Sequence, residues 1–387
     1  MLLLLFQKVV TFLSEKYLAI NKMEEYLNSA RKYRPNTFDK IVGQDNIVKI
    51  LRSQVISNNL HNSYLFCGSR GTGKTTTARI LAKAINCENS SKNNGNPCLN
   101  CEFCNKANKL GIFELDAASN NSVEDIRNII SQIRFTPIFN KYSVFIIDEV
   151  HMLSQAAFNS FLKTLEEPPK NTLFILATTE YYKVPATIVS RCQTFHFNNI
   201  DNGIIVNELK LILNNKNINF DEESLEIIAN KAEGSLRDAL SILDSVICYD
   251  NKKLSVEIVK KVLNILDDEV FFKILDFMIN KDIQNVLLEY KNIILNGFSE
   301  YNFFEGLIEF FLNLYLSKNN GTFRLINKPD ENKKQFKKKS TDINIENLEK
   351  TLKLINKYSI NYKFVINQTL FLDVLLIEIY ELLTKNE

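Results

Sequence analysis

The sequence predicts an α/β fold with a parallel sheet, followed by domains that are entirely helical. Apolar runs such as SYLFCG, KYSVFIID and NTLFILATTE alternate with amphipathic segments between residues 63 and 200. Strands that are apolar on both faces are typical of a parallel sheet covered by helices on both sides. After Phe197 only helical periodicity remains. We therefore expect an α/β core in the first part of the chain and all-α structure after it.

The predicted strands and helices alternate through the core. In chain order we expect a strand at 63–68, a helix at 76–86, strands at 112–118 and 141–153 with a helix at 122–133 between them, a helix at 155–167 and a strand at 171–180. Four amphipathic helices then follow, at 204–215, 221–233, 235–247 and 255–266. The remainder is helical, divided by the polar, lysine-rich run 327–342, which we interpret as a solvated loop that could also contact phosphate.

The composition is that of an ordinary globular protein. The chain has 387 residues, of which 45% are hydrophobic and 24% charged, enough for two or three domains with cores of their own. The formal net charge is +2. A nucleic-acid partner would therefore have to bind a local basic surface, because the protein as a whole is not a polycation.

The N-terminus lacks the features of a targeting signal. In MLLLLFQKVV the apolar run ends at Gln7, whereas a secretory signal needs about 7–15 apolar residues with particular flanks and a membrane span needs about 20. We interpret residues 1–23 as an extension of unknown role or an upstream artefact, with Met23 as the alternative start. We expect a cytoplasmic protein that has no membrane contact.

The octet GSRGTGKT matches the phosphate-binding motif G-x-x-x-x-G-K-[ST] in full. It follows a strand and opens a helix, and three of the chain's 11 glycines lie in it, which argues against a plain glycine turn. Backbone N–H groups of such a loop surround phosphates at a helix N-terminus. Lys74 would reach the β- and γ-phosphates, and the Thr75 hydroxyl would hold Mg²⁺. The predicted loop residues are Gly68, Ser69, Arg70, Gly71, Thr72, Gly73, Lys74 and Thr75.

A second motif, FIIDEVH (145–151), places two acids at the end of an apolar strand. In open α/β sheets, ligands bind at the carboxyl ends of the strands. Asp148 would hold Mg²⁺, and Glu149 would polarise the attacking water as a general base. His151 follows these acids, and we interpret it as a packed or hydrogen-bonded neighbour and not as the base.

Four of the seven cysteines are spaced C-x10-C-x2-C-x2-C. Short C-x2-C turns with four thiolates are typical of structural Zn²⁺ sites, and a reducing compartment favours metal over disulfides. Disulfides, free thiols and a DNA-reading finger are the alternatives, the last lacking a clear recognition helix. The predicted zinc ligands are Cys87, Cys98, Cys101 and Cys104; Cys67, Cys192 and Cys248 are interpreted as small core residues.

Several motifs of this chain occur in the same order as in one protein family. These motifs are SARKYRPNTFDKIVGQ, GSRGTGKT, the four-cysteine insert, LDAASN, IDEVHMLSQAAFNSFLKTLEEPP, LATTE, IVSRC and GSLRDAL. Over residues 24–265 the chain resembles the gamma/tau subunits of bacterial DNA polymerase III, the ATP-driven motors of the sliding-clamp loader. The resemblance implies an AAA+ core at 24–200 with a zinc module at 87–104, a helical lid at 201–266 and a helical collar, used for oligomerisation, at 267–387.

The resemblance also assigns roles to single residues. Thr179 matches sensor 1 of the family, with Thr178 as the one-residue alternative. Arg191 matches the arginine finger, which would act on ATP bound by the neighbouring subunit, and Arg237 matches sensor 2 in the lid. Val42 lies where the family places its adenine pocket.

The phosphate loop and the strand-end acids predict an ATPase that uses Mg²⁺, and the resemblance implies a motor that loads a clamp on primed DNA. It would belong to a DNA polymerase holoenzyme, with nucleotidyl transfer carried out by the complex and not by its own site. Expected partners are other clamp-loader subunits, the sliding clamp and primer–template DNA contacted through phosphates. The helix at 122–133, with Arg127 and Arg134, is a candidate DNA-facing element.

Two alternatives stay open at this point, and so does the length of the protein. The chain could be another DNA-acting AAA+ ATPase, such as a branch-migration motor, or a scaffold subunit with an inactive site. The lack of a tail resembles the short gamma form, which leaves the polymerase tethering of the tau form in doubt.

Overall fold

The computed structural model of the chain describes residues 28–106, 111–120, 122, 124, 141–250, 253–326, 328 and 330–384. The predicted extension at 1–23 lies outside these residues, as do Arg127, Arg134 and all of the helix at 122–133 except Ser122 and Glu124. The chain divides into two units, Met1–Val256 and Glu257–Glu387, whereas the sequence places the division after residue 266.

A five-stranded parallel sheet lies at the centre of the first unit, in the order β2-β3-β4-β1-β5. The strands are β1 (Ser63–Gly68), β2 (Ile112–Asp116), β3 (Ser143–Asp148), β4 (Thr172–Thr178) and β5 (Gln193–Phe197). The expected parallel sheet is thus confirmed. The edge strand β5 was not predicted, because Phe195 and Phe197 are buried while His196 between them is exposed. Such a short alternating strand lacks the continuous apolar run of its neighbours.

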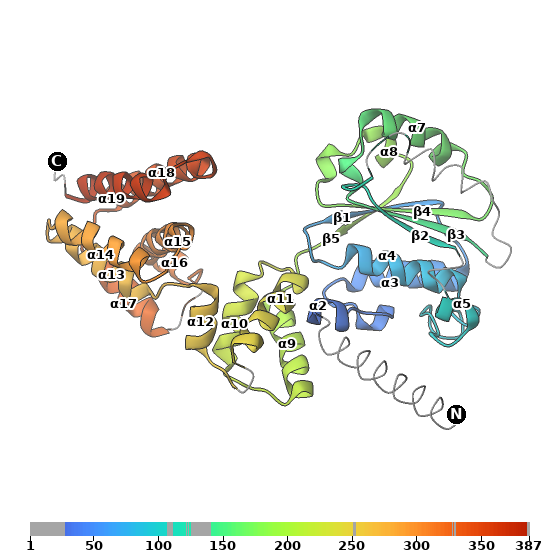
Figure 1. Ribbon diagram of the computed structural model, residues 1–387, viewed down its shortest axis with the longest axis horizontal. Coiled ribbons are helices and arrows are strands. Elements are labelled where there is room, and N and C mark those ends of the chain that lie inside the picture. Colours follow the sequence, from blue (N-terminus) through green and yellow to red (C-terminus); the bar gives the residue numbers. More distant parts are fainter. Residues whose placement is uncertain are drawn as a thin grey trace, which may run out of the picture. The chain divides into compact units, whose positions relative to one another are not determined.

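Helices cover both faces of this sheet (Figure 1). Helices α3 (Asp45–Ser57) and α4 (Lys74–Asn86) pack on one face, and α7 (Gln155–Glu166) and α8 (Ala186–Val189) on the other. Successive side chains of β1 serve the two layers in turn. Tyr64 and Phe66 join the core with α3 and α4, whereas Leu65 and Cys67 join the core with α7 and α8. The carboxyl ends of the strands are thereby held on a rigid three-layer scaffold.

Helices continue the first unit after the sheet, as expected, but this part also contains a two-stranded pair, so the expectation of all-α structure after Phe197 is wrong in that detail. The helices are α9 (Asn202–Lys216), α10 (Glu222–Lys231) and α11 (Leu236–Tyr249), and the two-stranded pair is formed by β6 (Asn219–Phe220) and β7 (Lys253–Leu254). The short N-terminal helix α2 (Ser29–Lys32) packs on α11, where Ser29 N–H donates to Asp244 Oδ2 at 2.6 Å. The segment that leads into the core is therefore attached to α11, a helix of the lid.

All the secondary-structure elements described in the second unit are helices. Its helices are α12 (Val256–Leu263), α13 (Asp268–Ile279), α14 (Ile283–Leu295), α15 (Glu300–Lys318), α16 (Asn320–Phe323), α17 (Asp330–Ser340), α18 (Ile345–Asn361) and α19 (Gln368–Thr384). Its core is rich in phenylalanine and leucine. This agrees with the predicted all-α domain.

The prediction of a solvated loop at 327–342 is wrong, because α17 occupies most of this stretch. Phe336 is 0% exposed and packs between the rings of Phe272 and Phe310, at centroid distances of 4.7 and 5.4 Å. Lys339 forms an ion pair with Asp276. A single buried aromatic residue in a lysine-rich run produces no periodic signal, so only tertiary packing reveals this helix.

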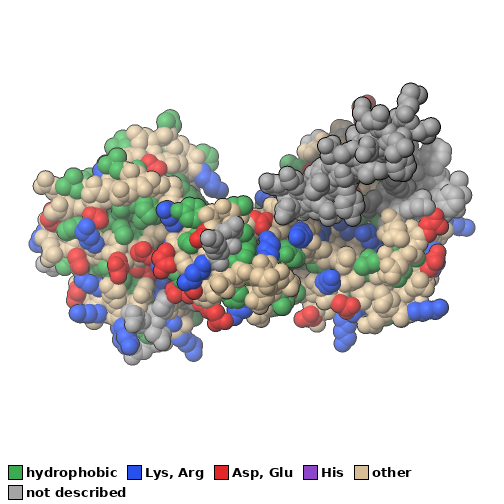
Figure 2. All heavy atoms as spheres, turned by 60° about the horizontal axis from the view of Figure 1, so that its bottom comes forward, with side chains coloured by type: hydrophobic (Ala, Val, Ile, Leu, Met, Phe, Trp, Pro, Cys, Tyr) green, Lys and Arg blue, Asp and Glu red, His purple; other side chains and the backbone are tan. Residues whose placement is uncertain are grey.

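Among the described residues, none of the helices combines the length and apolar character that crossing a membrane requires. Figure 2 shows one face of the molecule, on which basic and acidic side chains lie intermixed. This pattern agrees with the net charge of +2.

Candidate nucleotide site and cysteine cluster

The phosphate-binding loop joins β1 to α4, and its glycines adopt conformations that other residues avoid. Gly71 has a φ of 78° and Gly73, the residue before α4, a φ of 103°. A β-carbon at Gly71 would collide with the hydroxyl of Ser235, the residue that caps α11. The loop therefore approaches the lid too closely for any larger residue.

Lys74 is held inside this loop. Its side chain is buried, and Nζ donates to the carbonyl oxygens of Gly68 at 2.7 Å and Ser69 at 2.8 Å. Burial lowers the pKa of the amine, while the carboxylates of Glu149 and Asp148 act in the opposite direction. The ammonium group thus lies in the loop, where it bonds carbonyl oxygens and where phosphate oxygens could take their place as acceptors.

Thr75 and Asp148 meet at the start of α4. Thr75 Oγ1 donates to Asp148 Oδ2 at 2.7 Å. Adjacent ligands of an octahedral Mg²⁺ ion lie about 2.9 Å apart, given metal–oxygen distances of about 2.0–2.1 Å. The two oxygens therefore fit neighbouring positions around such an ion with only a small displacement.

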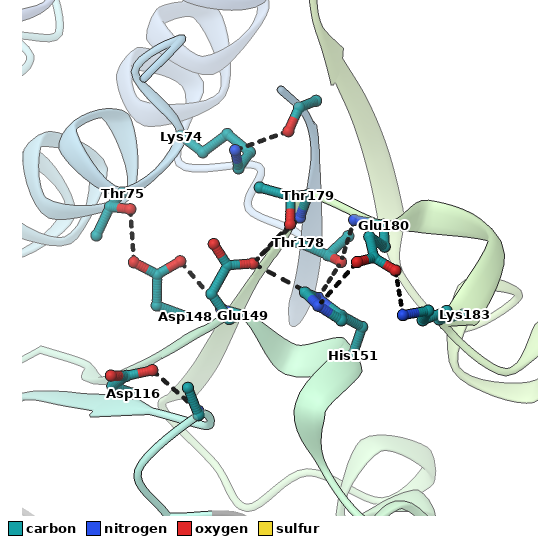
Figure 3. A network of polar contacts seen from close by, with 12 residues as sticks. Lys74, Thr75, Asp116, Asp148, Glu149, His151, Thr178, Thr179, Glu180 and Lys183 are labelled. Atoms are coloured by element: carbon teal, nitrogen blue, oxygen red, sulfur yellow. Dashed lines mark hydrogen bonds and ion pairs between the residues drawn. The ribbon is translucent and has the colours of Figure 1, made fainter. Parts of the chain in front are cut away.

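Glu149 follows β3 in a left-handed backbone conformation, with a φ of 48°. That conformation is unfavourable for a residue other than glycine and is often found at functional sites. Glu149 Oε2 accepts hydrogen bonds from Thr179 Oγ1 at 3.0 Å and from Thr179 N–H at 3.3 Å. The hydroxyl of Thr178 instead contacts His151 Nδ1 at 3.0 Å (Figure 3). Of the two threonines, Thr179 is the one that faces Glu149.

His151 is a hydrogen-bonded neighbour of the site, as the sequence suggested. Only 6% of its side chain is exposed. Its ring lies between two carboxylates, with Nδ1 3.5 Å from Glu149 Oε2 and Nε2 3.8 Å from Glu180 Oε1. Glu180 in turn pairs with Lys183 (Figure 3). The ring is therefore close enough to Glu149 to restrict the orientation of its carboxylate.

One pocket combines the loop with the lid and the N-terminal segment. Val42 and Arg237, both singled out from the sequence, line it together with residues 71–76 of the loop and helix. Gly68, Ser69 and Arg70 are not among its lining residues. The wall also contains residues that were missed: Ala30, Tyr33, Arg34, Pro35, Ile41, Ile200, Leu236 and Leu240. Several of these belong to the motif SARKYRPNTFDKIVGQ, which was the available signal.

Arg191 lies outside this pocket. Its Nη1 donates to the carbonyl oxygen of Thr187 at 2.7 Å, and its Nη2 lies 2.5 Å from Glu166 Oε1. The Arg191 side chain is 33% exposed and that of Glu166 is 48% exposed. The structure thus directs this arginine to the surface and not to the phosphate loop of its own chain.

The four clustered cysteines converge as a ligand set. Cys87 follows α4, Cys104 lies on the short helix α5 (Glu102–Lys106), and the four Sγ atoms lie within 4.8 Å of one another. The N–H groups of Cys98 and Cys101 donate to the sulfurs of Cys87 and Cys98, at 3.2 and 3.3 Å. No disulfide links these cysteines. Four thiols so placed fit a tetrahedral metal ion with metal–sulfur distances of about 2.3 Å.

The environment of these sulfurs favours a thiolate at one position. Burial opposes ionisation of Cys98, but hydrogen bonds from the N–H groups of Asn100 and Cys101 and from neighbouring thiols outweigh it and lower the pKa to about 6. Burial raises the pKa of Cys87 and of Cys104. One thiolate at neutral pH would give a metal ion its first charged ligand.

The other three cysteines differ from one another. Cys67 is buried in the core, and burial raises its pKa to about 11. Cys192 packs against the same core and has a pKa raised by burial to about 12. Cys248, expected in the core, is exposed, because it lies off the buried stripe of α11 formed by Ala239, Leu240, Leu243 and Val246.

A phosphate loop, a strand ending in two acids and a helical lid over one pocket define a P-loop protein of the AAA+ class. Two family models match the chain: "DNA polymerase III, delta subunit" over residues 43–201 and "DNA polymerase III clamp loader subunit, ATPase lid domain" over residues 204–252. The gamma subunit of DNA polymerase III from Buchnera aphidicola subsp. Baizongia pistaciae is 41% identical over 68% of this chain and 72% of its own length. The chain therefore belongs to the gamma/tau subunit family of DNA polymerase III.

Two further known proteins are similar to this chain. The tau subunit of Bacillus subtilis is 36% identical over 90% of this chain, and the chain spans 62% of that relative's length. A solved structure of the Thermotoga maritima RuvB Holliday junction branch migration motor matches 64% of this chain and 79% of its own, with 20% identity and a TM-score of 0.47. That similarity is too low to assign a function, and the family membership decides against the branch-migration alternative.

Proposed function

We propose that the chain is the ATP-driven motor subunit of a sliding-clamp loader in DNA replication. The observation that carries this proposal is a pocket lined by the phosphate loop with Lys74 and Thr75 and by Arg237 of the lid, with Asp148 accepting a hydrogen bond from Thr75. A catalytically inactive scaffold would have no need for these groups together. The family membership supplies the context of clamp, primed DNA and polymerase holoenzyme.

The proposed mechanism begins with nucleotide binding at the start of α4. The N–H groups of the loop and the helix N-terminus would surround the phosphates. Lys74 would exchange its bonds to Gly68 and Ser69 for phosphate oxygens, which are stronger, charged partners. Thr75 and Asp148 would hold Mg²⁺, which neutralises phosphate charge when bound.

Hydrolysis then requires a group that accepts a proton from water. Glu149 Oε2 accepts two hydrogen bonds from Thr179 and lies 3.5 Å from His151 Nδ1. It can therefore act as general base, with Thr179 fixing its orientation. Arg237 would contact the phosphates from the lid, so that the lid position depends on the nucleotide. Arg191 would complete the neighbouring subunit's site.

We further propose that Cys87, Cys98, Cys101 and Cys104 hold a structural Zn²⁺ ion. The chain is expected to retain about one zinc per molecule, because four converging thiols make a closed tetrahedral site. Cys101→Ser should retain none after dialysis, whereas Cys248→Ser, an exposed cysteine outside the cluster, should retain it fully. Metal analysis of the purified chains checks this, and equal zinc contents in both variants would contradict it.

The assembled complex tests the main proposal. We expect ATP turnover that is stimulated by the clamp and primed DNA, and we expect Lys74→Ala to lower it by about a hundredfold, the usual loss when one charged donor to a reacting group is removed. Lys83→Ala, on the same helix, is the matched control. Wild-type turnover no higher than that of Lys74→Ala would show that the site is inactive and favour the scaffold alternative.

The predicted domain boundaries, the DNA-facing role of residues 122–133 and the cytoplasmic location stay predictions. Purification of the assembled complex, with mass measurement of the intact assembly, would identify the partner subunits.

A further inference from the structure

One side chain of the cysteine loop reaches the segment that forms the nucleotide pocket. Asn96 lies two residues before Cys98 and is only 4% exposed. Its Oδ1 accepts from the N–H of Phe38 at 2.8 Å, and its Nδ2 donates to Asp39 Oδ2 at 2.7 Å. Both ends of the amide are thus used on the short helix η1 (Phe38–Lys40).

The helix η1 lies between two stretches that line the pocket. Residues 33–35 precede it and residues 41–42 follow it, and both stretches belong to the pocket wall. The backbone passes directly from one to the other, with Ile41 N–H bonded to the Phe38 carbonyl at 3.1 Å. A shift of η1 would therefore move both of these parts of the pocket wall.

The contact is tight on the side of the cysteine loop. Gly95 has a φ of 76°, and a β-carbon there would lie 3.2 Å from the carbonyl oxygen of Arg52 on α3. Arg52 forms an ion pair with Asp39, and its guanidinium lies 5.9 Å from the centre of the Phe38 ring. The loop, α3 and η1 are consequently packed around Asn96.

The cysteine cluster adjoins Asn96 in the chain. Pro97 separates Asn96 from Cys98, whose N–H donates to the sulfur of Cys87 at 3.2 Å. At the other end of the segment, Gln44 holds the chain through Asn198, donating to its carbonyl at 2.8 Å and accepting from its N–H at 3.3 Å. Two independent anchors therefore fix residues 37–44, and one of them comes from the cysteine loop.

We propose that Asn96 is a positioning residue through which the cysteine module holds the base-side wall of the nucleotide pocket. The module would thereby act on nucleotide affinity and not on the hydrolytic step, because the hydrogen bonds of the Asn96 side chain go to η1 and not to the phosphate loop, Asp148 or Glu149. This inference rests on the proposed ATP-binding function. It assigns the cysteine module a role in the ATP site, in addition to stabilising its own loop.

Binding of a fluorescent ATP analogue to the full chain tests the inference. Asn96→Ala removes one buried and one part-buried hydrogen bond. It should raise Kd by about tenfold, with a matching rise in KM and an almost unchanged kcat in the assembled complex. Lys92→Ala, an exposed change in the same loop, should leave Kd unchanged. Zinc content should stay equal in all three proteins, since Asn96 is not a ligand.

A reversal of the hydrogen bond separates positioning from general destabilisation. Asn96→Asp places a carboxylate against that of Asp39 and should weaken binding as much as Asn96→Ala. Adding Asp39→Asn restores a donor opposite the acceptor and should recover most of the affinity. A double variant that binds as weakly as Asn96→Asp, or an Asn96→Ala chain with wild-type Kd, would overturn the inference. A wild-type chain that fails to bind the analogue would instead refute the proposed function.

Discussion

Replacing Arg191 with alanine is expected to slow ATP hydrolysis by the assembled complex about a thousandfold, the lower end of the effect of arginine fingers supplied in trans. In the structure this guanidinium bonds Thr187 and Glu166 at the surface. An exposed ion pair of this kind contributes only about 1 kcal/mol or less. Loss of the ion pair with Glu166 would therefore cost little free energy if Arg191 moved to the phosphate of a neighbouring subunit.

The same variant should bind nucleotide normally, and this separates Arg191 from Arg237. Arg237 lines the pocket of its own chain, so Arg237→Ala should weaken binding of a fluorescent ATP analogue to the isolated chain. Arg191→Ala should not. Arg191→Lys should rescue little, because lysine lacks the planar fork of donors. Weakened binding by the isolated Arg191→Ala chain would show that the residue acts in its own site.

The main elements of the fold were predictable because they carry continuous signals. The strands at β1, β3 and β4 are apolar on both faces, and the phosphate loop is a contiguous motif between a strand and a helix. Strand β5 and helix α17 were not predictable, because each depends on one or two buried aromatic residues. Their identity as strand or helix comes from tertiary packing, which overrides weak local patterns.

The motif residues of the candidate site could be predicted from the sequence, but most residues that form the pocket wall could not. Lys74, Thr75, Asp148 and Glu149 come from two short motifs, whereas the bond between Asn96 and Phe38 joins residues 58 positions apart. The choice between two adjacent threonines could not be made from spacing alone. Successive residues at a strand end point in opposite directions, and the structure alone shows that Thr179 faces Glu149.

Replacing Glu149 with glutamine is expected to reduce ATP hydrolysis by about a thousandfold, within the usual range for loss of a general base. The amide oxygen can still accept from Thr179, so the local geometry should persist. The loop residues, Thr75 and Asp148 are untouched, and binding of ATP with Mg²⁺ should therefore be retained. Single-turnover kinetics on the assembled complex, with nucleotide binding measured on the same sample, check both expectations.

Glu180 is the matched control for this change, because it faces the same imidazole from the other side. Its Oε1 lies 3.8 Å from His151 Nε2, and it pairs with Lys183 away from the phosphate loop. Glu180→Gln removes the same charge at a similar distance from His151, and hydrolysis should fall by no more than a few fold, as for a surface ion pair. Equal losses in the two variants would mean that charge around His151, and not proton transfer by Glu149, limits the reaction.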